Sequence, residues 1–212
     1  MKINYFISTL IFIIPILGFS QANQWNQKAS FSGTSRFYGF SFSINGKGYI
    51  GCGQGASGNL QDVWEYDPSA NSWTQKSNYT GGIRLSPFGF SINDKGYVGG
   101  GLNGSVQSDF WIYDPGTNNW TQGNTFTGTA CYNACTFVIN GKGYVFSGSD
   151  NSPPYLTQLY EYDPGTSNWT QKSSIPSTGR SAPNAIVCNN KAYCIGGLIS
   201  NTPTATNEVW EY

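Results

Sequence analysis

The chain contains no histidine among its 212 residues. This absence excludes nucleophilic catalysis through a Ser-His or Cys-His pair, and it excludes zinc or copper centres with histidine ligands. Charge is also scarce, because 10% of the residues are charged, against about 25% in an ordinary soluble domain. Eleven basic and eleven acidic residues cancel, and without a basic cluster we do not expect nucleic acid as a partner.

Glycine and aromatic residues are abundant instead, with 27 glycines and 16% aromatics. A chain this aromatic is not disordered, and the combination favours many short strands joined by tight turns. The five cysteines are odd in number, so no disulfide framework is expected, although Cys131 and Cys135 are close enough in sequence to form a bridge. No metal and no cofactor is predicted.

The first residues have the pattern of a secretory signal peptide. Lys2 precedes a mostly apolar run, Ile3–Leu17, and Ser20 supplies a small residue for cleavage. The alternative is a membrane anchor, but Pro15 interrupts the run, which is shorter than the roughly 20 apolar residues of a membrane span. We expect residues 1–20 to be removed, leaving a secreted, periplasmic or cell-surface protein with no membrane span.

An internal repeat organises the rest of the chain. Four tryptophans follow one another at intervals of 48, 47 and 49 residues: Trp25, Trp73, Trp120 and Trp169. Four tyrosines repeat the same intervals: Tyr49, Tyr97, Tyr144 and Tyr193. The copies fall near residues 31–77, 78–124, 125–173 and 174–212, and such a period indicates a repeat architecture.

Each copy reads as four strands, a to d. Strand a ends at Asn45-Gly46, a pair suited to the two-residue turn that joins it to strand b. Strand b runs through the repeated tyrosine into a pair of glycines, where the missing side chains allow close backbone approach. Strand c reads VWEY, and Asp67-Pro68 starts the turn into strand d, which carries the repeated tryptophan. A four-stranded sheet repeated at this period is one blade of a β-propeller.

The glycine pair after strand b, the tyrosine in strand c and the tryptophan in strand d resemble the kelch repeat. The resemblance covers residues 25–212, although Gly51-Cys52-Gly53 and Ser147-Gly148 depart from the glycine pair. It implies an all-β, kelch-type β-propeller with about four blades of four antiparallel strands. Kelch propellers usually have six or seven blades and very varied functions, so the family indicates a fold more than an activity.

The two ends of the propeller domain, residues 21–212, leave two arrangements open. Residues 24–30 read QWNQKAS and match a lone strand d, while the chain stops after strand c of the last copy. In a closed ring of four blades, the N-terminal strand d completes the last blade and protects its edge. In the alternative, the chain is a fragment of a larger propeller, and further blades follow Tyr212.

Strand direction separates the loops into two sets. The a–b and c–d turns lie at one end of each blade and are nearly identical between copies. The b–c and d–a loops lie at the other end and differ in sequence and length. Because variable loops on a rigid scaffold carry binding functions, we predict a module that binds a protein or glycan ligand there, with anionic ligands included.

An arginine recurs thirteen residues before the repeated tyrosine, at Arg36, Arg84 and Arg180, whereas the third copy has Cys131. We predict that these arginines ring the mouth of the central channel and bind a carboxylate or a similar anion. Some kelch relatives bind acidic peptides or sugar acids through equivalent arginines, which the resemblance implies here. The alternative is that each arginine bonds backbone carbonyls of the neighbouring blade as part of the repeat.

Enzymatic activity is the less favoured hypothesis. The best-known kelch activity, that of galactose oxidase, uses a copper site with histidine ligands, which this chain lacks. A sialic-acid mutarotase of the kelch type needs a carboxylate beside the arginines, for which four residues qualify: Asp62, Asp109, Asp150 and Glu208. The strand c glutamates alternate with aromatic residues and are expected to face solvent: Glu65, Glu161 and Glu211.

Overall fold

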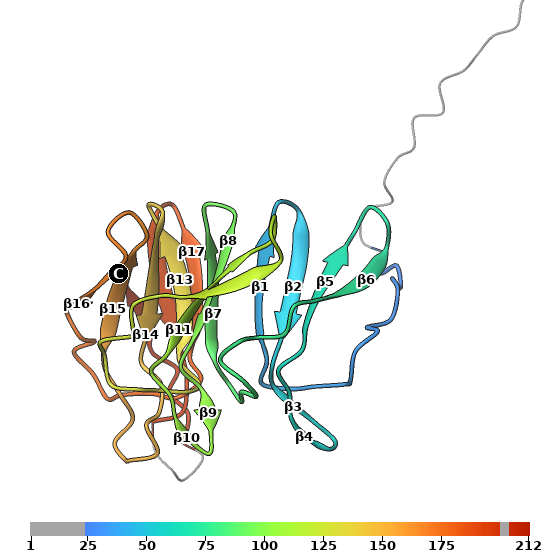
Figure 1. Cartoon of the computed structure of the whole chain (residues 1–212). Coiled ribbons are helices and arrows are strands. Elements are labelled where there is room, and N and C mark those ends of the chain that lie inside the picture. Colours follow the sequence, from blue (N-terminus) through green and yellow to red (C-terminus); the bar gives the residue numbers. More distant parts are fainter. Residues whose placement is uncertain (1–23, 200–203) are drawn as a thin grey trace, which may run out of the picture.

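The computed structural model describes residues 24–199 and 204–212, so the predicted signal peptide lies outside the described residues. Four antiparallel sheets follow one another along the chain as the blades of a propeller (Figure 1). The described part of the chain contains no helix that is long and apolar enough to span a membrane.

The strands a to d pair in the predicted order within each blade. Blade 1 consists of β1 (Phe40–Ile44), β2 (Lys47–Gly51), β5 (Val63–Asp67) and β6 (Ser72–Lys76). Blade 2 consists of β7 (Phe88–Ile92), β8 (Lys95–Gly99), β11 (Phe110–Asp114) and β12 (Asn119–Gln122). Blade 3 consists of β13 (Cys135–Ile139), β14 (Lys142–Phe146), β15 (Leu159–Asp163) and β16 (Asn168–Lys172). Blade 4 has three strands, β17 (Asn184–Cys188), β18 (Lys191–Ile195) and β19 (Val209–Glu211).

The a–b turns confirm the prediction made from Asn45-Gly46. Both central residues of every such turn have positive φ, as the two-residue hairpin turn that matches strand twist requires. The c–d turns are also as predicted, since the Asp67 carboxylate accepts a hydrogen bond of 2.8 Å from the Ser69 amide. The equivalent bonds to Asp114 and Asp163 recur in blades 2 and 3. These aspartates therefore form turns.

Aromatic side chains fill the space between successive blades. Trp169 packs edge-on against Phe110 and Phe126, with both pairs of ring centroids 4.9 Å apart. The glycines of strand b take part in the same packing, because Gly143 lies directly under the ring of Phe90 from the preceding blade. A methyl group at this glycine would overlap the ring, so the blades approach closely only because the side chain is missing.

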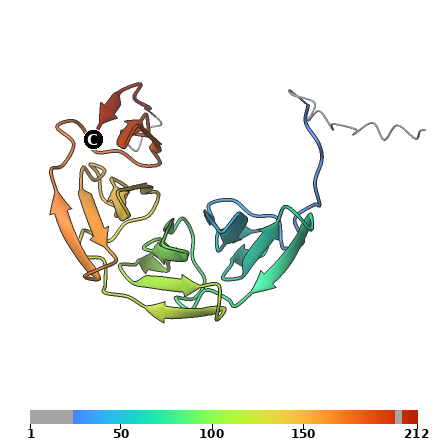
Figure 2. The ribbon, with the colours of Figure 1, turned by 90° about the horizontal axis from the view of Figure 1, so that it is seen from above.

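The four blades form an open arc (Figure 2). Residues 24–30 lie at the end of the arc formed by blade 1, and blade 4 forms the opposite end. Residues 24–30 are not paired as a strand, and blade 4 has no fourth strand among the described residues. The closed ring in which the N-terminal strand completes the last blade is therefore not the arrangement of this structure.

All five cysteines are free thiols. The possible bridge between Cys131 and Cys135 is not formed. Cys135 instead packs against the apolar cluster that includes Cys194 of the neighbouring blade, and Cys131 is buried. The fold accordingly rests on packing between blades.

Candidate functional site

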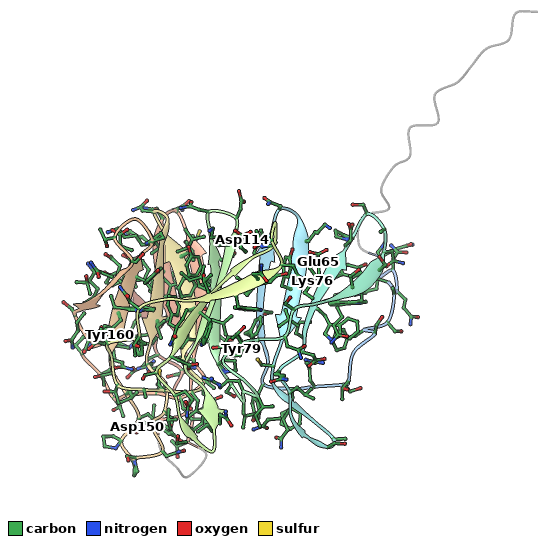
Figure 3. All side chains as sticks on the ribbon, in the orientation of Figure 1. Glu65, Lys76, Tyr79, Asp114, Asp150 and Tyr160 are labelled. Atoms are coloured by element: carbon green, nitrogen blue, oxygen red, sulfur yellow. The ribbon has the colours of Figure 1, made fainter. Side chains whose placement is uncertain are left out.

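The variable loops lie at the same end of every blade. We call this end the loop face; it comprises the b–c loops and the d–a loops, which lie opposite the a–b turns (Figure 1). In blades 1 and 2 the b–c loop forms a small hairpin, made by β3 (Gln54–Gly55) with β4 (Gly58–Asn59) and by β9 (Leu102–Asn103) with β10 (Ser105–Val106). The b–c loop of blade 3 has no such hairpin and carries Asp150, which Figure 3 places at this end.

Arg36, at the entry to blade 1, binds a carboxylate of its own blade. Its two Nη atoms contact the two Oδ atoms of Asp62 at 2.8 and 2.7 Å, which is a bidentate pair. Nη1 also donates to the carbonyl oxygen of Cys52 at 3.2 Å. The arginine thus ties the start of strand c to the end of strand b.

Arg84 and Arg180 repeat this arrangement in blades 2 and 4. Arg84 contacts both carboxylate oxygens of Asp109, at 2.6 and 2.9 Å, and the Gly100 carbonyl at 2.7 Å. Arg180 contacts Glu208 at 2.7 Å. The exposed fractions of the two arginines are 1% and 0%, so the guanidinium groups lie beneath the loop face.

A tryptophan of strand c completes each of these sets. The indole N–H of Trp64 donates to Asp62 at 2.7 Å, and Trp111 and Trp210 donate to the carboxylates of their own blades at 2.8 Å. We call this set the Arg–carboxylate–Trp motif. The arginines were predicted as ligand-binding residues and the carboxylates as candidates for an enzymatic site, but neither their pairing nor the tryptophan was predicted; the constant position of the tryptophan two residues after each carboxylate was the available signal.

Blade 3 replaces all three members of the motif with neutral residues. Cys131 stands in place of the arginine, Gln158 in place of the carboxylate and Tyr160 in place of the tryptophan. The Gln158 amide instead exchanges two hydrogen bonds of 2.9 Å with the backbone of Thr129. A buried arginine without its carboxylate is costly, which explains why the charges are absent as a pair.

Electrostatics favour the ionised forms of Asp62 and Glu208. The Trp210 indole, then Arg180 and then Ser177 hydrogen-bond Glu208 and lower the pKa of its carboxyl to about 2. Burial raises the pKa of Asp62, but the hydrogen bonds from Arg36 and Trp64 outweigh this effect, and the net pKa is lowered. The Arg36–Asp62 and Arg180–Glu208 pairs are therefore closed ion pairs at neutral pH.

A second polar cluster lies between the blades and corrects one prediction. Glu65 and Glu161 do not face solvent, since their exposed fractions are 7% and 8%. Glu161 accepts hydrogen bonds from the Tyr144 hydroxyl at 2.7 Å and from the Lys142 ammonium at 3.0 Å. Lys172 of strand d lies 3.1 Å from Glu161, and Figure 3 shows the equivalent pair in blade 1, where Lys76 lies 3.4 Å from Glu65.

The prediction was wrong because strand alternation assumes one solvated face, whereas the neighbouring blade covers that face here. Glu211, on the uncovered blade 4, is exposed as predicted. Within residues 24–199 and 204–212, no three Cys, Asp or Glu side chains are grouped so that they could hold a metal ion.

Comparison with known proteins agrees with this architecture. The kelch motif is matched over residues 91–127 and again over residues 129–176. No curated protein matches the chain. Among solved structures, the one titled "Structure of YjhT" is 22% identical and has a TM-score of 0.73, over 83% of this chain.

The chain spans 62% of the length of that structure, and at this identity the likeness shows the fold. The described residues form an all-β, four-bladed β-propeller arrangement, in which residues 91–127 and 129–176 match the kelch motif.

Proposed function

We propose that the chain is an exported kelch-repeat binding module that recognises a protein or glycan ligand through the loop face. The observation that supports this is the contrast between the two ends of each blade. One end is built from turns with the same backbone conformation in every blade. The other end presents loops that differ in sequence and conformation from blade to blade, as ligand-binding loops on a rigid scaffold do.

The chemistry of the loops suits a neutral, polar ligand. The b–c loops of blades 2 and 3 expose small, uncharged residues, with Asn103 and Ser105 in blade 2 and Asn151 and Ser152 in blade 3, whereas the d–a loop of blade 1 exposes Phe37 and Tyr38. The small polar side chains offer adaptable hydrogen bonding to hydroxyl and amide groups. Sugar hydroxyls and peptide backbone groups are therefore the ligand groups that we expect to bind.

Arg36, Arg84 and Arg180 contribute in one of two ways. As predicted from the sequence, they bind an anionic ligand, which must then compete with Asp62 and its equivalents for the guanidinium groups. Alternatively, they support the loops from beneath through the carbonyl contacts at the ends of strands b. An acidic sugar that binds the wild-type chain but not the Arg36→Ala variant, with the fold retained, supports the first role.

The experiment uses the triple variant Asn103→Ala, Ser105→Ala, Asn151→Ala. Its matched control is the variant Thr117→Ala, Thr166→Ala, in which two exposed residues of the opposite turns are changed. The probe is an array that carries neutral glycans, sialic acids and extracellular host proteins. We expect the loop variant to bind at least about tenfold more weakly, a loss of about 1.4 kcal/mol, and the control to bind as the wild type does. Equal binding by both variants, or no binding by the folded wild-type chain, would refute the proposal.

A carbohydrate enzyme, such as a sialic-acid mutarotase, is the second candidate. It is favoured by the carboxylates that lie beside the arginines, with Asp109 at 2.6 Å from Arg84. The test is the rate of anomer exchange of N-acetylneuraminate, followed by NMR with and without the chain. Acceleration that is lost in the Asp109→Asn variant favours the enzyme, and an unchanged rate excludes this activity.

A further inference from the structure

One contact between neighbouring blades recurs along the chain, between strand a of one blade and strand b of the next. Phe40 of β1 and Val98 of β8 lie in one buried cluster, with exposed fractions of 2% and 0%. Phe88 of β7 and Val145 of β14 hold the same two positions one repeat later, and they lie together in the next cluster. An aromatic ring and a valine thus join blade 1 to blade 2 and blade 2 to blade 3.

The two backbones approach closely at this contact. A methyl group at Gly89 would lie 3.1 Å from the Cβ of Phe40 in the preceding blade. Gly89 pairs directly with Val98 in the sheet, so both side-chain positions point towards blade 1. The side chain on strand a therefore lies over this pair of the next blade.

At the contact between blades 3 and 4, both positions are cysteines. Cys135 of β13 replaces the phenylalanine, and Cys194 of β18 replaces the valine. Cys194 is 4% exposed in the third buried cluster, and Cys135 and Ala185 pack against that cluster. Ala185 pairs directly with Cys194, as Gly89 pairs with the valine of blade 2. The interaction with the Cys135 thiol lowers the pKa of Cys194, and the same interaction raises that of Cys135.

The other three cysteines have no such partner. Cys52 and Cys131 belong to the two other buried clusters, with one cysteine in each. Cys188 is exposed at the end of β17, next to the a–b turn of blade 4. Only one pair of cysteines in the chain therefore shares a cluster, and this pair joins two blades.

Two free thiols are a poor replacement for the ring and the valine of the other contacts. The exchange of large buried side chains for small ones weakens packing and costs stability. A covalent bond between the two sulfurs would offset this loss. The close approach of the strands suits such a bond, because the two Cβ atoms of a disulfide lie about 3.8 Å apart.

We propose that Cys135 and Cys194 form a disulfide that links blade 3 to blade 4. Disulfides form and persist in exported proteins, so the inference rests on the proposed export of the chain. It does not depend on the proposed ligand of the loop face, since both cysteines lie inside the packed sheets.

The reaction needs an electron acceptor, which is another disulfide such as glutathione disulfide. The Cys194 thiolate attacks one sulfur of glutathione disulfide, releases the other as a thiolate and becomes a mixed disulfide. The Cys135 thiolate then attacks the sulfur of Cys194 and releases the second glutathione as a thiolate. The two protons that the cysteines lose pass to the two released thiolates, so one disulfide is reduced as the other forms. Because the sulfurs are covered in the folded chain, we expect the exchange to occur before blades 3 and 4 pack.

The first test refolds the purified full chain in mixtures of oxidised and reduced glutathione and then alkylates the remaining thiols. We expect three of the five cysteines to be alkylated. Digestion with trypsin without reductant should give peptide 96–142 linked to peptide 192–212. Because the first peptide also contains Cys131, the Cys131→Ala variant is the matched control and should keep the link, whereas Cys135→Ala should lose it.

The second test measures urea unfolding of the refolded chain with and without a phosphine reductant. We expect the unfolding equilibrium constant of the oxidised chain to be at least about 30-fold lower than that of the reduced chain. The Cys135→Ala, Cys194→Ala double variant should show no effect of the reductant, and the control Cys188→Ala should behave as the wild type does. Two thiols that serve only for packing would make every variant insensitive to the reductant.

Five alkylated thiols after refolding at every glutathione ratio would overturn the proposal, and so would a link that survives in the Cys135→Ala variant. Both outcomes concern the purified chain without a ligand. They are therefore distinct from a failure of the loop face to bind glycans or proteins.

Discussion

Blades 3 and 4 are built from nearly the same repeat, yet their side chains are covered to very different extents. Blade 3 lies between two neighbours, and its tyrosine Tyr162 is buried under Trp169. Within residues 24–199 and 204–212, blade 4 has a neighbour on one side only, and apolar residues of its strands are exposed, among them Ile186, Val187 and Val209. The burial of a repeat is therefore decided by its neighbours as much as by its own sequence, as expected where stability comes from contacts between repeats.

The largest effect should follow from making blade 3 resemble blade 4. Trp169→Ala empties the space that the indole fills between blades 2 and 3, and we expect the free energy of unfolding to fall by about 3–5 kcal/mol. Urea unfolding followed by circular dichroism measures this loss. Trp169→Phe is the control and should lose less, because it refills part of the space. A loss below about 1 kcal/mol for Trp169→Ala would show that the indole does not join the two blades.

A somewhat smaller effect is expected from the Arg–carboxylate–Trp motif of blade 2. Arg84→Cys leaves the Asp109 carboxylate without its cation and should cost about 3 kcal/mol. The triple variant Arg84→Cys, Asp109→Gln, Trp111→Tyr transfers the neutral set of blade 3 and should recover most of that loss. Thermal and urea unfolding of the two variants decide the matter. A triple variant as unstable as the single one would contradict the idea that the charges are removed as a pair.

Hydrogen exchange should show the difference between the blades in the unaltered chain. We expect the amides of β17 and β18 to exchange about tenfold or more faster than those of β13 and β14, because fewer buried contacts oppose local opening. Mass spectrometry of the exchanged chain resolves these segments. Equal protection in both blades would mean that the missing neighbour has no energetic consequence.

The smallest effect concerns acid. Because the folded-state pKa of Glu208 is lowered to about 2 from an ordinary 4.5, its ion pair stabilises the fold above pH 4.5. That contribution is lost as the pH falls from 4.5 towards 2. The Glu208→Gln variant should be slightly less stable than the wild type at pH 7 and equally stable near pH 2, as measured by thermal unfolding. A difference that persists at pH 2 would assign the effect to packing instead of charge.

Much of the fold was predictable because the four copies of the repeat can be aligned position by position. The pairs of turn residues and the spacing of the tryptophans predicted strands, turns and blade order, all of which depend on local conformation. The burial of Glu65 was not predictable in the same way, because it depends on a tyrosine and two lysines supplied by other strands and on a neighbouring blade.

The site was partly predictable for a similar reason. The recurrence of Arg36 and its equivalents predicted a shared role, and three of the four carboxylates named as candidates, Asp62, Asp109 and Glu208, bind them, whereas Asp150 does not. The bidentate geometry and the burial of the guanidinium groups depend on how loops fold back onto strand ends. The open arc was likewise beyond local patterns, because it depends on the angle between blades.

The glycine beneath Phe90 bears on that angle. Gly96 and Gly143 each lie under a phenylalanine of the preceding blade, whereas blade 4 has Ala192 at this position. A methyl group at Gly96 or Gly143 would overlap the phenylalanine ring above it, so this position of the repeat limits how closely neighbouring blades approach near their inner strands.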